Sequence, residues 1–217
     1  KSAFAEFHRG NWHPITWLSH MLDIQLFGLN AGPHHLVNLL FHAANAILLF
    51  LLLWRMTRAR WQSAGAALLF AIHPLHVESV AWISERKDVL YGFFFILGLI
   101  SYTKYVDGRK IGNFLLSLLW FLLSLASKPA AIIFPLVLFS IDFLRSRKPD
   151  IMMFLEKAPF LLFSGLLAWL TLKAQTTAGA TDTIAAFPLN LRIFYANYGY
   201  MMYLVKLVFP VGLAAFY

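Results

Sequence analysis

The sequence predicts an all-α membrane protein: a polytopic bundle of about seven transmembrane helices, with an amphipathic surface helix in the first extracytoplasmic loop. Hydrophobic residues make up 60% of the 217 residues and charged residues only 13%. Soluble domains are roughly 45–50% apolar and ~25% charged. The apolar residues also gather in runs, and residues 43–54 hold one asparagine and no charge. Such a run lacks the polar stripe that a helix in a soluble fold carries.

The apolar runs have lengths that suit membrane helices. A helix of about 20 residues crosses the hydrocarbon core, and shorter ones do so where the bilayer thins. Seven segments are candidates: 35–54, 63–82, 88–104, 111–126, 129–144, 158–173 and 191–211. The fourth and fifth are short, so the break at residues 127–129 also fits a re-entrant pair. The chain thus divides into a loop at 1–34, with a juxtamembrane helix, and a transmembrane bundle at 35–217.

Basic residues predict the orientation of this bundle. Ten of them lie in three alternate short connections: Arg55, Arg58 and Arg60; Lys104, Arg109 and Lys110; and Arg145, Arg147, Lys148 and Lys157. The positive-inside rule makes these connections cytoplasmic. Residues 1–34, 85–88, 128 and 174–190 are then extracytoplasmic, in a bacterial inner membrane or the endoplasmic reticulum. The net charge of +8 is explained by topology, and we expect no nucleic-acid partner.

The first loop contains a second kind of helix. Residues 15–27 alternate apolar and polar groups at helical spacing, after Pro14 and before Gly28, which are typical start and stop residues. Trp and Phe on one face indicate a helix lying along the bilayer surface. Packing against the bundle is an equally good interpretation, and the two are compatible.

A polar stripe follows the first predicted span. His35, Asn38, His42 and Asn45 are spaced three, four and three residues apart, which places them on one helical face. That face cannot point at lipid. It either forms hydrogen bonds between helices or lines a polar cavity, with His34, His35 and Asn38 nearest the mouth.

The segment 73–88 joins two apolar runs and carries several ionisable groups, which at a membrane edge indicate function. His73 and His76, three residues apart with Glu78 nearby, resemble a metal-binding pair. Pro74 kinks or ends the helix between them, which weakens that interpretation. We favour hydrogen bonding to substrate or proton handling and expect no metal, with structural packing as the remaining possibility.

Three basic residues lie on the predicted extracytoplasmic face, where the positive-inside rule leads us to expect few of them. Arg86, Lys87 and Lys128 combine a planar fork of donors with point charges, which suits a phosphate or pyrophosphate anchored in the outer leaflet. The alternative is contact with anionic headgroups, or with Glu85 and Asp88.

Other common chemistries have no signature here. The chain has no cysteine, which removes metal thiolates and a cysteine nucleophile and leaves the redox compartment open. It shows neither a glycine-rich phosphate loop nor a G-x-S-x-G turn, so nucleotide chemistry is not expected. Because the chain starts at Lys1 without an initiator Met and stops at Tyr217 just after a helix-like segment, we expect it to be a fragment.

Three stretches together resemble a known family. They are NWHPITWLSHMLD at 11–23, GPHHLVNLLFH at 32–42, and HPLHVESVAW at 73–82, which continues to the basic pair at 86–87. They are similar to the membrane-embedded part of the tetratricopeptide-repeat transmembrane O-mannosyltransferases and their bacterial relatives, which are glycosyltransferases of the C superfamily. The resemblance covers about residues 4–145. The helical repeats of that family are absent from these residues.

The resemblance implies an enzyme that takes a mannose-like sugar from a polyprenyl or dolichyl phosphate and places it on a protein hydroxyl outside the cytoplasm, with inversion. Its implied partners are membrane lipids, the lipid-linked donor and a protein acceptor, with no cofactor and no divalent metal. In that family an acid of the first extracytoplasmic loop, usually in an acidic pair, is the general base. Here the loop has only Glu6 and Asp23, unpaired. We therefore expect the base upstream of Lys1 and treat Glu78 as a weak catalytic candidate.

The remaining site residues are assigned by matching the family's motifs to positions of this sequence. The family's H-P-x-H-x-E segment corresponds to His73, Pro74, His76 and Glu78, its basic segment to Arg86 and Lys87, and its later lysine to Lys128, where Pro129 replaces the usual acid. The predicted lipid-phosphate ligands are Arg86, Lys87 and Lys128. The predicted substrate pocket comprises His34, His35, Asn38, His73, His76 and Glu78.

Two other functions remain open. A transporter or flippase for a lipid-linked or anionic substrate needs ionisable or broken-helix sites near the bilayer midplane. Only His42, Asn45 and Asn197 lie at such a depth, whereas the charges lie at the helix ends. A non-catalytic membrane scaffold is the third possibility.

Overall fold

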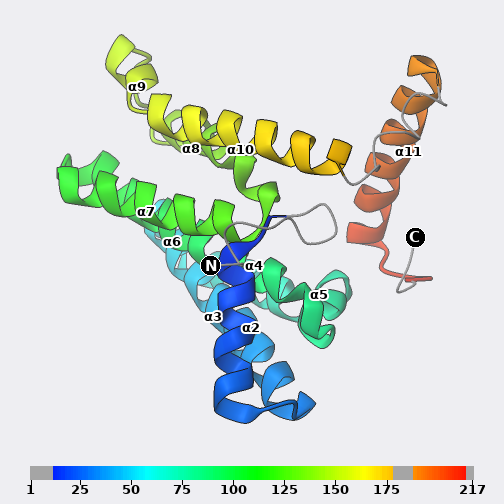
Figure 1. The fold of residues 1–217 in the computed structure, drawn as a ribbon. Coiled ribbons are helices and arrows are strands. Elements are labelled where there is room, and N and C mark those ends of the chain that lie inside the picture. Colours follow the sequence, from blue (N-terminus) through cyan, green and yellow to red (C-terminus); the bar gives the residue numbers. More distant parts are fainter. Residues whose placement is uncertain (1–11, 178–187, 214–217) are drawn as a thin grey trace.

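The protein is all-helical in the part described by the structure, a computed structural model that covers residues 12–177 and 188–213 (Figure 1). Within those two ranges no strand occurs. The elements are α2 (Pro14–Phe27), α3 (Ala31–Thr57), α4 (Arg60–Ile72), η1 (Pro74–His76), α5 (Val77–Ala81), η2 (Ile83–Glu85), α6 (Arg86–Gly108), α7 (Ile111–Ser127), η3 (Pro129–Ile133), α8 (Phe134–Leu144), α9 (Ile151–Leu155), α10 (Ala158–Thr177) and α11 (Leu189–Val208).

Three segments are long and apolar enough to cross a membrane: Ala31–Thr57, Ile83–Gly108 and Ile151–Thr176. A fourth is obtained if Arg60–Ile72 and Pro74–Ala81, which meet at an angle of 50°, are taken as one broken span. The break falls at Pro74, as the sequence predicts, because proline cannot continue a helix at this point without losing a hydrogen bond.

The remaining predicted spans do not qualify as full-length membrane spans. The apolar helices Ile111–Ser127 and Pro129–Leu144 have 10–17 residues each, and α11 is not among the segments that meet the test for a span. The described residues therefore show a membrane-type helical protein with three or four full-length spans. The count of seven stays a prediction.

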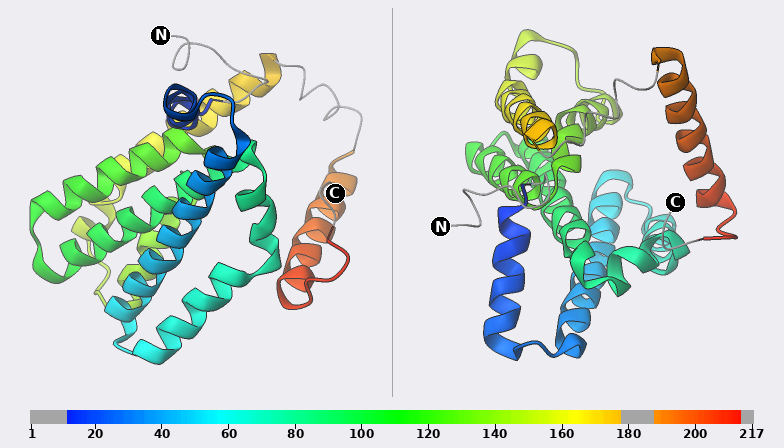
Figure 2. Two further views of the ribbon diagram at one scale, coloured as in Figure 1. Left: turned by 90° about the horizontal axis from the view of Figure 1, so that it is seen from below. Right: turned by 45° about the vertical axis from the view of Figure 1, so that its right-hand side comes forward.

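Helices α3, α4, α6 and α7 run back and forth between two ends of the molecule, whereas α2 lies across them (Figure 2). At one end, Arg55 of α3 bonds to Asp107 of α6 over 2.6 Å, and Arg145 after α8 lies 3.7 Å from the same carboxylate. The predicted basic connections thus lie together, and we call this the basic end. The opposite end holds the start of α6 and the end of α7. We call it the motif end, because all three family-like stretches reach it.

One of the ten cations assigned to the basic connections is not at the surface. Lys157 is fully buried and bonds to Asp142, which in turn accepts a 2.9 Å hydrogen bond from Tyr102. Burying an ammonium group is costly unless a partner compensates it, and Asp142 supplies that partner. Lys157 therefore joins helices inside the bundle and adds no surface charge.

The core consists of aromatic rings between α6, α7, α8 and α10. Phe121, Phe134 and Phe160 are all 0% exposed, and their ring centroids lie 4.9–5.6 Å apart. Gly98 of α6 permits this packing, because a Cβ there would come within 2.9 Å of the Phe134 ring.

The predicted loop helix is present as α2 and lies against the bundle with its polar side. Thr16 and Asp23 are buried, and the Thr16 hydroxyl donates to the Ser127 carbonyl over 3.1 Å. Its exposed apolar residues are Trp17, Leu18, Met21, Leu22, Ile24, Leu26 and Phe27. Packing on the bundle is thus observed, whereas contact of the outer apolar face with lipid stays a prediction.

The last described helix stands to one side of the others. Both figures show α11 away from the core helices. His73 Nε2 lies 3.0 Å from the carbonyl of Leu207 and links α11 to the break between α4 and η1.

Candidate functional site

The predicted polar face of α3 is buried, but it contains His34 where the spacing predicted His35. His34, Asn38, His42 and Asn45 are 0–8% exposed, whereas His35 is exposed. An α-helix has 3.6 residues per turn, so of two neighbouring residues only one can face inward. In the structure His34 faces inward and His35 faces outward.

This stripe bonds to the irregular segment that follows α4. Helix ends leave main-chain carbonyls without helical partners, and inside a membrane these need partners from the protein. Three of the four contacted carbonyls lie at or beyond helix ends: His42 Nε2 lies 2.9 Å from that of Ala71, and Asn38 donates to those of Val80 (3.3 Å) and Trp82 (3.2 Å). The fourth belongs to Val89, in the first turn of α6, and accepts from Asn45 over 2.9 Å. The hydrogen-bonding interpretation of the stripe is therefore confirmed for Asn38, His42 and Asn45.

Arg86 lies at the centre of the motif end, with its side chain 0% exposed. It donates to Asp23 (2.7 Å), to Ser19 (2.8 Å), to the His34 carbonyl (3.0 Å) and to Asn38 Oδ1. The guanidinium thereby joins α2, α3 and α6. Its partners are protein groups, and they are not Glu85 or Asp88. Contact of Arg86 with a lipid phosphate stays a prediction.

The two lysines are paired with acids but remain accessible. Lys87 lies 2.8 Å from Glu85, and Lys128 bonds to Asp88, whose second oxygen accepts a 3.1 Å hydrogen bond from Ser79. Both lysine side chains are close to 30% exposed (28% and 29%). Pairing with the neighbouring acids, the predicted alternative, is thus what the structure shows for both lysines. Their exposure still permits an anionic ligand to reach them.

A first pocket, of about 320 Å³, lies between α3, α6 and the segment after α4. Its polar lining includes His42, Asn45, His76, Ser79, Asp88, Tyr91 and Lys128, and its apolar lining includes Phe70, Phe95 and Ile96. We call it the Lys128 pocket. His76 and Lys128 were predicted from the sequence as site residues, whereas Asp88 and Tyr91 were not.

A second, larger pocket of about 980 Å³ lies between α2, the start of α3 and the loop before α6. It is lined by His13, Thr16, Trp17, His20, Ile24, Leu29, Ala31, His34, His35, Ala81, Trp82, Ile83, Ser84, Glu85 and Lys87. We call it the Lys87 pocket. Lys87 and Asp88 are consecutive yet line different pockets, so the first turn of α6 separates the two spaces.

Two histidines that precede the first span, His13 and His20, have pKa values below the usual range. Burial and the nearby Lys87 and Lys128 lower the pKa of His13 from 6.5 to about 4. Burial and Arg86 also lower the pKa of His20. Both imidazoles are neutral at pH 7 and so offer a lone pair as well as a donor.

Of the other predicted pocket residues, His73 lines a third, smaller pocket of about 210 Å³ together with His42 and His76. His73 Nδ1 accepts a 3.2 Å hydrogen bond from the Leu75 amide, and its other nitrogen contacts Leu207. Both nitrogens of His73 are therefore engaged, and the His73–His76 pair does not offer two ligand atoms to a metal. Glu78 is exposed on α5 and lines neither the Lys128 nor the Lys87 pocket.

The described residues thus define a membrane-type helix bundle with two pockets at one end, each lined by both apolar and polar residues and each containing an accessible lysine. Comparison with known proteins adds relatives that share part of this sequence. The chain is 32% identical over 123 residues to Protein O-mannosyl-transferase Tmtc1 of Drosophila melanogaster, which is 57% of this chain and 14% of that protein. It is 37% identical over 94 residues to Protein O-mannosyl-transferase TMTC3 of Mus musculus, covering 43% of this chain and 10% of the relative.

A third relative, Protein O-mannosyl-transferase tmtc2 of Xenopus laevis, is 38% identical over 112 residues, 52% of this chain and 13% of the relative. The resemblance indicated by the motifs is therefore confirmed: over about half its length the chain is similar to proteins named protein O-mannosyl-transferases. The matches span only 10–14% of these relatives' length. No family model matches the chain, and no solved structure matches it.

Proposed function

We propose that this chain is the membrane core of a glycosyltransferase that transfers mannose from a polyprenyl or dolichyl phosphate to a protein hydroxyl on the extracytoplasmic side, with inversion. The observation that carries the proposal is the similarity, at 32–38% identity, to proteins named protein O-mannosyl-transferases. The geometry supports it through two pockets at the end opposite the basic connections.

We assign the donor to the Lys128 pocket. A lipid-linked sugar phosphate is amphipathic, and this pocket combines an accessible ammonium group with an apolar wall of Phe70, Phe95 and Ile96. An ammonium has three donors, so Lys128 can keep Asp88 and still bind a phosphate oxygen. A volume of about 320 Å³ lies in the usual range of ligand pockets. The Lys87 pocket, which is larger and lies under α2, is assigned to the acceptor segment.

The general base is a separate question. Three of the acids described at the motif end have cationic partners: Asp23 with Arg86, Glu85 with Lys87 and Asp88 with Lys128. The fourth, Glu78, lies outside both pockets. None of these four described acids therefore combines a free carboxylate with a place in either pocket, and Glu6 lies outside the described residues. The proposal of a base before Lys1 rests on the family resemblance alone.

The experiment is mannose transfer from dolichyl phosphate mannose to an acceptor protein by the purified intact protein. Lys128→Gln removes the charge, and a hydrogen bond to a charged group contributes about 1.5–3 kcal/mol. We therefore expect kcat/KM for the donor to fall about 10- to 150-fold. The matched control is Lys110→Gln, an exposed lysine at the basic end, which should leave transfer unchanged.

Two outcomes would contradict the proposal. Equal donor kinetics for the Lys128 and Lys110 variants would remove Lys128 from the donor site. If the wild-type protein moves lipid-linked sugar across vesicle membranes without any transfer to protein, the transporter or flippase function would replace the transferase.

A further inference from the structure

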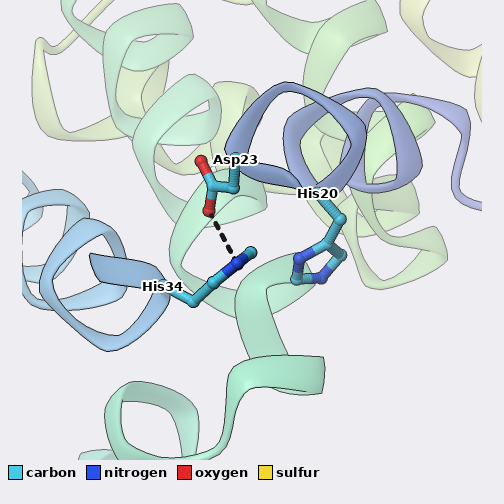
Figure 3. Close-up of side chains that lie close together, drawn as sticks. All are labelled: His20, Asp23 and His34. Carbon is cyan, nitrogen blue, oxygen red and sulfur yellow. Dashed lines mark ion pairs between the residues drawn. The ribbon is translucent and has the colours of Figure 1, made fainter. Parts of the chain in front are cut away.

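A cluster of three potential metal ligands lies where α2 meets α3. His20 and Asp23 are one turn apart on α2, and His34 is in the first turn of α3 (Figure 3). One ligand atom from each residue lies within 4.8 Å of the other two. Asp23 and His34 are buried, and His20 is half-buried. The cluster is separate from the His73–His76 pair that the sequence indicated.

The hydrogen bonding of His34 determines which of its nitrogens carries the proton. Nε2 lies 3.0 Å from the carbonyl of Gly28. A carbonyl oxygen only accepts, so Nε2 is the protonated nitrogen and Nδ1 of a neutral ring has a lone pair. Nδ1 is buried and has no hydrogen-bond partner, although it lies 3.4 Å from Asp23 Oδ2. His34 as a whole is 7% exposed.

This arrangement brings two electron-rich atoms together in a buried space. A buried polar atom without a partner is unfavourable, and a lone pair facing a carboxylate adds repulsion. Either a proton on Nδ1 or a cation between the two groups relieves both effects. The second imidazole, that of His20, lies beside the same carboxylate and supplies a third ligand atom.

We infer that His20, Asp23 and His34 bind a divalent transition-metal ion of the zinc class. Two imidazole nitrogens and one carboxylate oxygen are a common ligand set for zinc, and three protein ligands leave one position of a tetrahedron open. The outer contacts are also typical: the Gly28 carbonyl orients the His34 ring, and Arg86 bonds to the Asp23 carboxylate over 2.7 Å.

The local charge indicates what completes the site. Asp23 and Arg86 cancel, so a bound dication leaves two uncompensated positive charges beside the Lys87 pocket, which His20 and His34 line. An anionic oxygen from a ligand in that pocket, such as a carboxylate or phosphate, fits the open position. Metal binding should therefore tighten when inorganic phosphate is added.

The test uses the intact protein, purified without a polyhistidine tag and stripped of metal with a chelator. We expect one equivalent of Zn²⁺ by mass spectrometry after dialysis. We also expect Co²⁺ to give the visible absorption bands of a tetrahedral nitrogen–oxygen site. His20→Ala and His34→Ala should each weaken Zn²⁺ binding by more than the about 10- to 100-fold that loss of an outer-shell partner costs. His35→Ala, which removes the exposed neighbour of His34, should not weaken it.

Melting temperatures distinguish a loss of the zinc site from a loss of the fold. Zn²⁺ should raise the melting temperature of the wild type and of His35→Ala but not that of His20→Gln, which preserves size and polarity. If the wild type retains no Zn²⁺, or if both histidine variants bind it as the wild type does, the inference is wrong. In the first case a proton on His34 Nδ1, visible by nitrogen NMR, would account for the geometry.

Discussion

Arg86 and Asp23 form an ion pair of 2.7 Å whose two side chains are 0% and 6% exposed. The residues are 63 positions apart in the sequence, and the pair fixes α2 to the start of α6. Both pockets border this contact, since Lys87 and Asp88 follow Arg86 directly and His20 lies one turn before Asp23.

The first prediction concerns the stability that this pair provides. Arg86→Gln leaves the Asp23 carboxylate buried without its cation, and breaking a buried pair from one side costs about 3–5 kcal/mol. The free energy of unfolding in mixed micelles should fall by that amount. Adding Asp23→Asn should recover part of the loss. Arg55→Gln, which breaks a half-exposed pair with Asp107, should cost only about 0–1 kcal/mol. Equal losses for Arg86 and Arg55 would contradict the structure.

The second prediction concerns the aromatic core. In Gly98→Ala the new Cβ would lie 2.9 Å from Cε2 and Cζ of Phe134, a ring that is 0% exposed. Overpacking of this kind costs about 1–3 kcal/mol, so thermal unfolding should occur at a lower temperature. Gly165→Ala has open space around the new atom and should be neutral or stabilising by up to ~1 kcal/mol. A melting temperature that is unchanged in Gly98→Ala would show that α6 and α8 are packed less closely.

The third prediction concerns pH. The pKa of His13 falls from 6.5 to about 4 in the folded protein, through burial and the charges of Lys87 and Lys128. Between these values the unfolded chain binds the proton and the folded protein does not, so stability decreases as the pH falls from 6.5 toward 4. In His13→Gln, the slope of unfolding free energy against pH should be smaller over that window. Gln25→Ala, which changes an exposed residue of α2 that does not titrate, should keep the wild-type slope.

The fourth prediction concerns orientation. The chain has no cysteine, so single cysteines can be introduced without background. Ala59→Cys lies at the basic end, between α3 and α4, and Ser84→Cys lies at the motif end in η2. We expect impermeant thiol reagents to label the cysteine at 59 only from the cytoplasmic side and the one at 84 only from the opposite side. Reversed labelling would invert the proposed orientation.

Local sequence patterns predicted the positions of several helices, but they could not predict which distant residues pair with each other. Helical spacing and apolar runs located α2, α3 and α6 within a few residues, and Pro74 marked the break. The partner of Arg86 was missed, because spacing reveals nothing about residues 63 positions apart. One signal was available: Asp23 is the sole charged residue between residues 12 and 30, and an isolated acid on such a helix requires a cation.

The incorrect placement of His35 on the buried face of α3 has a similar cause. Whether His34 or His35 faces inward depends on the rotation of α3, which the contacts of Asn38 and Asn45 fix and the sequence spacing alone does not. Glu78 was favoured as a pocket residue because it belongs to a motif, yet α5 turns its side chain outward. From the sequence, Asp88 was considered only as an acid that could pair with the nearby basic residues. It lines the Lys128 pocket because of the direction of the first turn of α6, which the sequence does not reveal.

The hydrogen bonds from α3 to the segment after α4 limit how the pockets can change shape. His42, Asn38 and Asn45 hold carbonyls spread from Ala71 to Val89, so that segment cannot slide along α3 without breaking several bonds at once where no water replaces them. The segment after α4 should therefore keep its position along α3 when a ligand occupies either pocket.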